Sequence, residues 1–316
     1  MPLPSETFAT YQAIGNREDL SDDIYRIAPT ETPFMTAVDK VKASAVNHEW
    51  QLQDLASPDT ANAVLEGDDA TTDAVTPTVR RGNICQISDK VARVTGTQQA
   101  VDHAGRDDEL AYQEMLKGLE LKRDMESMVL GTNQIKVTGD TTTARKSASI
   151  LSWIKTNTSK SGSDPGTADG AASRTDGTQR AFTEQQLKTV LSAIWTSGGR
   201  PDTIMAGAFN KQVFSTFTGR STPTEDAKSK KIVASVDAYE SDFGTVKVIP
   251  NRFQRSRDVL VLEMDKWGLA HLNGRKMVSI PLAITGDSRR KQVLSEWTLE
   301  ARNEAASGGI FDLTVS

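Results

Sequence analysis

The stretch DDELAYQEMLKGLELKRDMESMVLGT, Asp107–Thr132, carries the longest helical pattern in the chain. Its apolar residues recur every three or four positions and so share one helix face; they are Tyr112, Met115, Leu116, Leu119, Met125, Met128 and Val129. The polar side predicts charge pairs of Glu114 with Lys117, Glu120 with Arg123, and Lys122 with Glu126. Gly131 predicts the end of the helix. At about 1.5 Å per residue, about 25 residues give a helix of nearly 40 Å, which predicts an axis for the molecule.

Two extended segments precede this helix, and a long polar connection joins them. From Asn47 the residues alternate, with His48, Trp50 and Leu52 on one side, and a second extended run covers residues 83–95. The connection, residues 54–82, has six acidic side chains against Arg80 and Arg81, a net charge of -4. A connection this long and polar is unusual inside a compact domain, so we expect a hairpin that projects from the body.

Residues 1–46 form a series of short pieces that could not make a core alone. One piece aligns Leu20, Ile24, Ile27 and Ala28, and the next is APTETPFMTAV, Ala28–Val38. Here Thr32 is placed to cap a helix that begins at Pro33. The predicted apolar face of this short helix comprises Phe34, Ala37, Val38 and Val41. Such a helix needs a surface to lie on. Two interpretations remain open: the face packs on the chain's own long helix, or it docks on an adjacent molecule.

The remainder of the chain predicts a mixed α+β domain. Residues 156–181 contain no aliphatic residue larger than alanine, so we expect an exposed, mobile insertion. A helix then begins at Thr183, with Gln186 completing a capping box, and ends at Gly198; its predicted core face is Leu187, Val190, Leu191, Ile194 and Trp195. A second helix is predicted from Phe209, Val213 and Phe217. The predicted strands are residues 203–206, 231–236, 245–249, 259–262, 277–284, 293–301 and 310–315.

The bulk composition is that of an ordinary globular protein. The 316 residues are 37% hydrophobic and 25% charged, with a net charge of -5. An acidic chain is a poor nucleic-acid binder. The single cysteine, Cys85, cannot form an internal disulfide, which fits a reducing cytoplasm. No segment has the apolar length of a membrane span, and we expect no membrane partner.

A search for chemistry predicts no catalytic residue, no cofactor and no metal. The three histidines, His48, His103 and His271, share no motif, and no nucleotide-binding, serine-hydrolase or zinc-protease pattern occurs. The acidic string EGDDATTD, residues 66–73, lacks the spacing of a calcium loop, so we expect it to be solvated. The basic clusters at residues 252–257 and 288–292 lack an aromatic platform, and we expect them in salt bridges or solvent.

An arm, a projecting hairpin, one very long helix, a mixed domain and a return strand follow one another in this chain. In that order it resembles the major capsid proteins of tailed bacteriophages with the HK97-type fold. The resemblance rests on four strings: PTETPFMTAV; GTQQAVDHAGRDDELAYQEMLKGLELKRDMESMVL; GGRPDTIMAGAFNKQVF; and EWTLEARNEAASGGIFDL. It implies an N-terminal arm (1–46), an extended E-loop (47–95), a peripheral domain (96–134 and 287–316) and an axial domain (135–286).

The resemblance also implies a function. The expected role is a structural, non-enzymatic subunit that self-assembles into hexamers and pentamers of an icosahedral shell enclosing double-stranded DNA. Expected partners are further copies of the chain and separate scaffolding, portal and decoration proteins. The expected location is the virion, after assembly in the host bacterial cytoplasm. Candidate contacts between subunits are Phe34, Val38, Val41, Trp50, Glu66, Asp68, Asp69, Arg80 and Arg81.

Two other functions stay open at this stage. A structural protein of a phage tail or adhesin would also use long polar loops. A phage-encoded enzyme would have to use His271 or the acidic string, the only candidates that the sequence offers.

Overall fold

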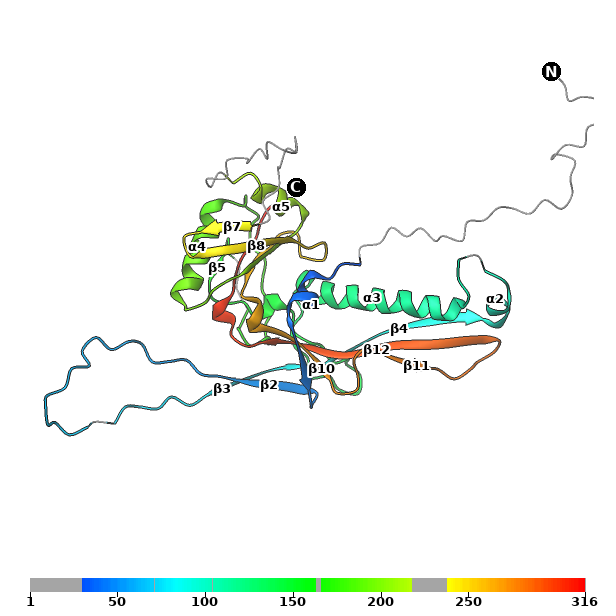
Figure 1. Ribbon diagram of the computed structural model, residues 1–316, viewed down its shortest axis with the longest axis horizontal. Helices are drawn as coiled ribbons and strands as arrows, with labels where there is room; N and C mark the ends of the chain where they lie inside the picture. The colour runs from blue at the N-terminus through cyan, green and yellow to red at the C-terminus, as the bar shows by residue number, and fades with distance from the viewer. Residues whose placement is uncertain (1–29, 71, 104, 163–165, 218–237, 316) are drawn as a thin grey trace, which may run out of the picture.

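One long helix and three β-sheets organise the part of the chain that the computed structural model describes, residues 30–70, 72–103, 105–162, 166–217 and 238–315. The long helix lies beside the five-stranded sheet, and a six-stranded sheet forms a lobe near the helix's C-terminal end (Figure 1). A two-stranded sheet leads out of the body. The fold is α+β, as the sequence predicts. Residues 1–29 and 218–237 lie outside the described residues, and with them the segment Leu20–Ala28 and the predicted strand 231–236.

The long helix, α3, spans Glu109–Gly131. Asp108 caps it by accepting a hydrogen bond from the backbone N–H of Ala111 at 3.0 Å. The predicted end at Gly131 is confirmed, and a Cβ there would lie 2.7 Å from the carbonyl oxygen of Phe253. Burial is uneven along the helix. Most of its buried apolar residues lie in the second half, namely Leu121, Met125, Met128, Val129 and Leu130; Leu110 is buried near the start, and Met115 is exposed.

The charge pairs predicted along α3 are wrong in part. Lys117 pairs with Glu120 at 2.9 Å instead of Glu114. The carboxylate of Glu114 instead reaches Lys291, 2.7 Å away on a neighbouring strand. The predicted partner of Lys122, Glu126, is fully buried on the core side of the helix. Spacing along a helix cannot distinguish a solvated charge from one that a tertiary partner has drawn inward.

The five-stranded sheet is built on the longest strand of the chain. Its strand order is β1-β10-β12-β11, and β4 pairs with β12 as well; the bounds are β1 Asp39–Ala43, β4 Gln86–Thr95, β10 Trp267–Leu272, β11 Val278–Pro281 and β12 Ser288–Ala301. The β4–β12 pair is antiparallel from Ser288 opposite Thr95 to Trp297 opposite Gln86. The predicted strand 293–301 is therefore confirmed but begins earlier. The predicted strand 277–284 is shorter than expected. Strands β1 and β10 were not predicted from the sequence.

The six-stranded sheet and two helices form a second structural unit, which we call the six-stranded lobe. Its strand order is β5-β13-β9-β6-β8-β7, with bounds β5 Thr158–Ser159, β6 Thr203–Ala206, β7 Ala238–Ser241, β8 Gly244–Pro250, β9 Val259–Leu262 and β13 Gly308–Ile310. Helix α4 (Glu184–Thr196) begins with the predicted capping box of Thr183 and Gln186, and helix α5 is Ala208–Phe214. Trp195 was predicted in the core of α4 but is 59% exposed and stacks on Phe243.

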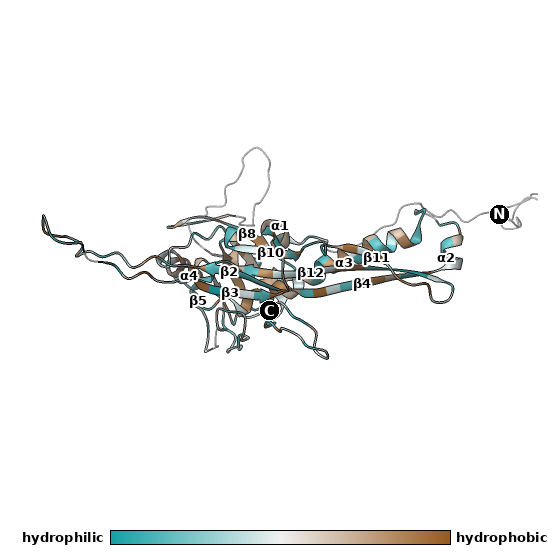
Figure 2. Ribbon diagram, turned by 90° about the horizontal axis from the view of Figure 1, so that it is seen from below, coloured by the Kyte–Doolittle hydropathy of each residue, from teal (hydrophilic) through white to brown (hydrophobic). Residues whose placement is uncertain are grey.

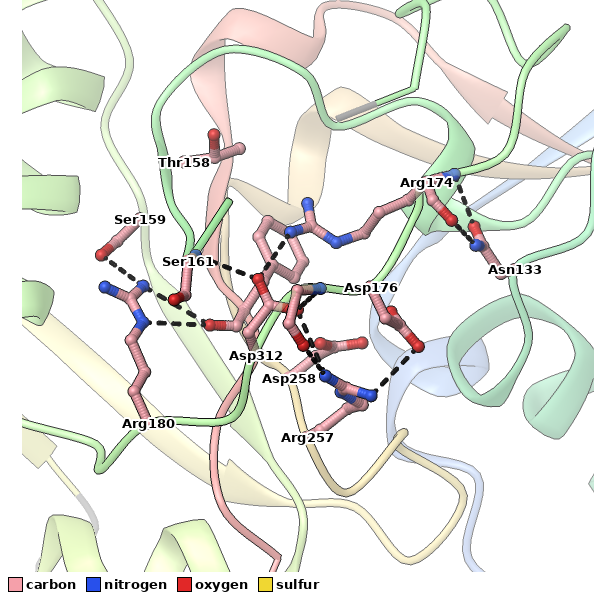
Figure 3. A network of polar contacts seen from close by, with 12 residues as sticks. Asn133, Thr158, Ser159, Ser161, Arg174, Asp176, Arg180, Arg257, Asp258 and Asp312 are labelled. Carbon is pink, nitrogen blue, oxygen red and sulfur yellow. Dashed lines mark hydrogen bonds and ion pairs between the residues drawn. The ribbon is translucent and has the colours of Figure 1, made fainter. Parts of the chain in front are cut away.

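The prediction of a final strand at residues 310–315 is wrong. Strand β13 ends at Ile310, and Asp312 has a φ of 62°, in the left-handed region that an extended strand cannot contain. This turn directs the Asp312 carboxylate into a buried polar network (Figure 3).

That network corrects the expected exposed insertion at residues 156–181. The described residues of this segment are attached to the lobe, because β5 pairs with β13 and Arg174 is 2% exposed. The Asp312 carboxylate accepts hydrogen bonds from the backbone N–H groups of Ser161 at 3.1 Å and Gly177 at 2.8 Å. Arg257 bridges Asp312 and Asp176, and Arg180 bonds to Ser159 (Figure 3). Polar anchors hold a segment that lacks the apolar residues of a core.

The described part of the arm, residues 30–46, packs against the body rather than lying apart from it. Helix α1 (Pro33–Ala37) begins at Pro33, as predicted, but the Thr32 side chain makes no capping hydrogen bond. Phe34, Met35 and Val38 enter the main core with α3 and the five-stranded sheet, whereas Ala37 is exposed. Strand β1 then pairs in parallel with β10. Of the two interpretations of the apolar face, packing on the chain's own helix is the one observed.

Candidate assembly surface

A hairpin projects from one end of the body, as the alternating residues predicted. Strand β2 (Asn47–Leu52) pairs antiparallel with β3 (Val79–Ile84). Beyond the pair, residues 53–70 and 72–78 form a long excursion away from the rest of the chain (Figures 1 and 2). Every described residue from 53 to 80 is exposed. The described residues of this excursion therefore bury almost none of their surface within the subunit.

The excursion carries apolar side chains that a monomer leaves in water. Four of them are 79 to 97% exposed; they are Leu55, Val64, Leu65 and Val75. Scattered exposed apolar residues are ordinary, but here they lie on a segment with no other surface to cover them. The same loop holds the predicted contact residues Glu66, Asp68 and Asp69, all exposed. In the described part of the chain none of these three carboxylates forms an ion pair.

The base of the hairpin is tied to the core by buried polar and aromatic contacts. The Trp50 ring lies 5.4 Å from the Trp153 ring, and His48 Nε2 lies 3.0 Å from Glu300 Oε2. Asn83 is fully buried, donates to the Leu299 carbonyl at 2.8 Å and accepts from the Ala148 N–H at 2.9 Å. Asn83 was not predicted, because a lone asparagine in a strand gives no signal of its tertiary partners.

The remaining predicted contact residues lie either on the hairpin strands or in the arm. Trp50, Arg80 and Arg81 lie on the paired strands of the hairpin, where Arg80 is exposed and reaches Glu49 at 3.2 Å. Phe34 and Val38 do not fit a contact between subunits, because burial inside their own chain leaves them almost no surface. Val41 is half-buried in β1, opposite Ala270.

Basic residues gather where β4 ends and β12 begins, at the other end of the body from the hairpin (Figure 1). Arg290 stands directly opposite Arg93 in the antiparallel register, and Arg289 beside them is exposed. Like charges facing each other across two strands are unfavourable unless an anion lies nearby. We call Arg93, Arg289 and Arg290 the basic end. Its charge is opposite to that of the projecting loop.

In the second basic cluster, residues 252–257, Arg255 and Arg257 are partly buried in the lobe's polar network, whereas Arg252 is exposed. Arg255 pairs with Asp176, and Arg257 with Asp176 and Asp312. The expectation that this cluster serves salt bridges is confirmed.

The residues considered for catalysis do not form an accessible site. His271 is buried, its only described side-chain hydrogen bond joins its Nδ1 to the buried Ser295 hydroxyl at 3.5 Å, and burial lowers its pKa to about 4. Burial raises the pKa of the Cys85 thiol to about 11, which disfavours the reactive thiolate. Across the described ranges, no three metal-ligating side chains gather to hold an ion. None of the described helices is both long and apolar enough to cross a membrane.

Similarity to known proteins extends over almost the whole chain. A family model described as SU10 major capsid protein matches residues 4–314. The major capsid protein of Escherichia phage Phieco32 is 27% identical over 345 residues, with 96% of each chain covered.

Solved structures support the fold independently of sequence. A chain from Gordonia phage Cozz aligns with a TM-score of 0.63 at 9% identity, covering 100% of this chain and 98% of its own. A chain of the capsid asymmetric unit of cyanophage A-1(L) aligns with a TM-score of 0.64 at 13% identity, covering 97% and 98%. The fold is the HK97-type capsid fold, as the sequence led us to expect. With the family model covering nearly every residue, the chain belongs to the SU10 major capsid protein family and is a structural capsid protein of a phage.

Proposed function

We propose that copies of this chain form the hexamers and pentamers of an icosahedral head that encloses double-stranded DNA. The observation that carries the proposal is the hairpin, since its described residues 53–70 and 72–80 are all exposed and no other part of the described subunit covers them. A protein gains little by holding such a segment in water, whereas each hairpin that lies on a neighbour buries area in every contact of a closed shell.

The charges suggest where a hairpin docks. The loop with Glu66, Asp68 and Asp69 is acidic, and the basic end of β4 and β12 lies across the body from it. One surface of a subunit then meets a different surface of the next, which is the head-to-tail contact that closes into rings. Leu55 and Leu65 would supply the apolar part of the interface, with the charges at its rim. Trp50, Arg80 and Arg81 would lie at the margin of the same contact.

The domain boundaries expected from the family resemblance are kept as part of this proposal. Residues 1–46 would act as the N-terminal arm, 47–95 as the E-loop, 96–134 with 287–316 as the peripheral domain, and 135–286 as the axial domain. Strands β10 and β11 depart from this division, because both belong to the five-stranded sheet although they fall within 135–286.

Further partners belong to the proposal as well. One structural neighbour is a phage G major capsid protein solved with a decoration protein; it aligns with a TM-score of 0.53 at 11% identity. By analogy, decoration, scaffolding and portal proteins would act on this shell, and assembly would take place in the host cytoplasm. The subunit would carry no enzymatic activity and no cofactor, and it would enclose DNA without reading its sequence.

A charge-swap experiment tests the docking. Replacing Glu66, Asp68 and Asp69 by lysine should abolish assembly, because the loop would then meet the basic end with like charge. Adding Arg289→Glu and Arg290→Glu should restore it. The control is Glu240→Lys with Asp242→Lys, two exposed acidic residues at β7. Sedimentation measures the assembled fraction, and circular dichroism checks the fold. Normal assembly of the triple lysine variant would contradict the proposed contact.

A further inference from the structure

Glu126 is a buried carboxylate that bonds to three backbone or side-chain donors at once. Its Oε1 accepts from the Phe34 N–H at 2.9 Å and its Oε2 from the Met35 N–H at 2.8 Å. A third donor, the Asn251 side-chain amide, lies 2.7 Å from Oε1. The Glu126 side chain is fully buried. A charge in this position is tolerated only while its hydrogen-bond partners are in place.

The three donors come from parts of the chain that are far apart in sequence. Phe34 and Met35 form the first turn of α1 in the arm. Glu126 itself lies on α3. Asn251 directly follows β8 of the six-stranded lobe. One side chain therefore joins the arm, the long helix and the lobe.

In the arm, Glu126 supplies what the local sequence does not. The first N–H groups of a helix have no partner within the helix, and a side chain at the capping position normally accepts from one of them. Thr32 makes no such hydrogen bond. Glu126 takes its place from across the core, so the two N–H bonds that hold α1 depend on a residue outside the arm.

In the lobe, Asn251 is held in a single orientation. Its backbone N–H donates to the Ala206 carbonyl at 2.9 Å, and its Oδ1 accepts from the Phe253 N–H at 2.9 Å. Its amide nitrogen consequently points at Glu126. Movement of this segment relative to α3 would remove one of the carboxylate's three donors.

The surroundings of Glu126 act on its pKa in opposite directions. Burial raises the pKa of Glu126, and the hydrogen bonds from Met35, Phe34 and Asn251 oppose that rise, as does the positive charge of Lys40. The Lys40 ammonium bonds to the carbonyl oxygens of Met35 and Val38 at the end of α1. The arm is thus held at its start by a carboxylate and at its end by an ammonium group.

We propose that Glu126 couples the arm to the six-stranded lobe, so that displacement of Asn251 loosens α1 even though Asn251 bonds to Glu126 and not to the arm. The coupling resides within one subunit and can be measured without assembly. It does not rest on the proposed docking of the hairpin.

Hydrogen exchange at the Phe34 and Met35 amides of the full chain tests this coupling, since both amides bond to the carboxylate directly. We expect Glu126→Gln to accelerate exchange at these amides roughly tenfold or more, the effect of losing a charged hydrogen bond. Asn251→Asp should do the same: it keeps the shape and the acceptor for Phe253 but replaces the donor by a second acceptor. Glu120→Gln, at a half-exposed position of α3 where the carboxylate pairs with Lys117, should leave exchange unchanged.

Two outcomes would overturn the coupling. One is unchanged exchange at Phe34 and Met35 in Asn251→Asp, with acceleration in Glu126→Gln alone. The other is an equal acceleration at these amides and at Leu187 and Val190 in α4, which would reflect general loosening of the fold. Acceleration confined to α1 in both variants is the expected result.

Discussion

The guanidinium of Arg174 lies 3.6 Å from the carboxylate of Asp312, and neither side chain is more than 1% exposed. The guanidinium also lies 3.5 Å from the centre of the Phe311 ring. This contact attaches the segment of residues 156–181, which lacks aliphatic core residues, to the C-terminal end of the chain. A buried pair is costly to break, because the partner left behind is a desolvated charge.

Replacing Arg174 by methionine should therefore destabilise the protein by about 3 to 5 kcal/mol. Lys188→Met is the matched control, since its pair with Glu184 at 2.9 Å is half exposed and is worth less than about 1 kcal/mol. Thermal unfolding of the two variants and the parent provides the comparison. Equal melting temperatures for both variants would show that the buried pair does not hold the segment.

Asp258 should make stability depend on pH in the same network. Burial raises the pKa of Asp258 to about 6, against the attraction of Arg255 and Arg174. A raised folded-state pKa gives a stabilising contribution that is complete below the unfolded pKa and is lost as pH rises through about 6.

The parent should accordingly lose on the order of 1 kcal/mol relative to Asp258→Asn between pH 5 and pH 7.5. All other titrating groups are shared, so the difference between the two unfolding curves isolates this carboxyl. A difference that stays constant with pH, or one that grows in favour of the parent, would be inconsistent with a raised pKa.

Gly177 marks a close backbone approach within the anchored segment. A Cβ at this position would lie 1.8 Å from the carbonyl oxygen of Ser161, which side-chain rotation cannot relieve. Gly177→Ala should displace the segment and lower the melting temperature by several degrees. At Gly207 the nearest atom would be 3.5 Å away, so Gly207→Ala serves as the control. Similar melting temperatures for the two variants would mean that the segment is not fixed at Gly177.

Phe34 should behave as a core residue of the subunit. Its side chain is fully buried among residues of α3 and the five-stranded sheet, so Phe34→Ala should cost about 3 to 5 kcal/mol. Chemical unfolding of the unassembled chain measures this directly. A loss of assembly with unchanged subunit stability would instead favour docking of Phe34 on a neighbour.

The sequence predicted those elements whose residues share one face or one local motif. Helix α3, the capping box at Thr183 and Gln186, and the alternation of β2 are all local patterns. The burial of α3 was predicted less well, because the exposed Met115 looks the same in a periodic pattern as the buried Met125.

Residues that act through tertiary partners gave no such signal. Glu126 fits the spacing of a surface charge pair, and its burial is explained by donors remote in sequence, the Phe34 and Met35 N–H groups and the Asn251 amide. Arg174 lies in a stretch whose composition is that of an exposed loop, and its partner follows 138 positions later, in a turn that replaces a predicted strand. Strand β10 is buried on both faces, so an alternation of apolar and polar residues could not reveal it. For the assembly surface, sequence predicted the projecting loop but not its anchor at Asn83.

We propose above that copies of this chain form a closed shell. Electron microscopy of the purified assembly, produced alone and with a co-expressed scaffolding protein, tests it most directly. We predict icosahedral particles whose hexamers and pentamers join through the hairpin of residues 47–84. An unassembled monomer in both preparations, or a small ring or fibre like those of tail proteins, would contradict it.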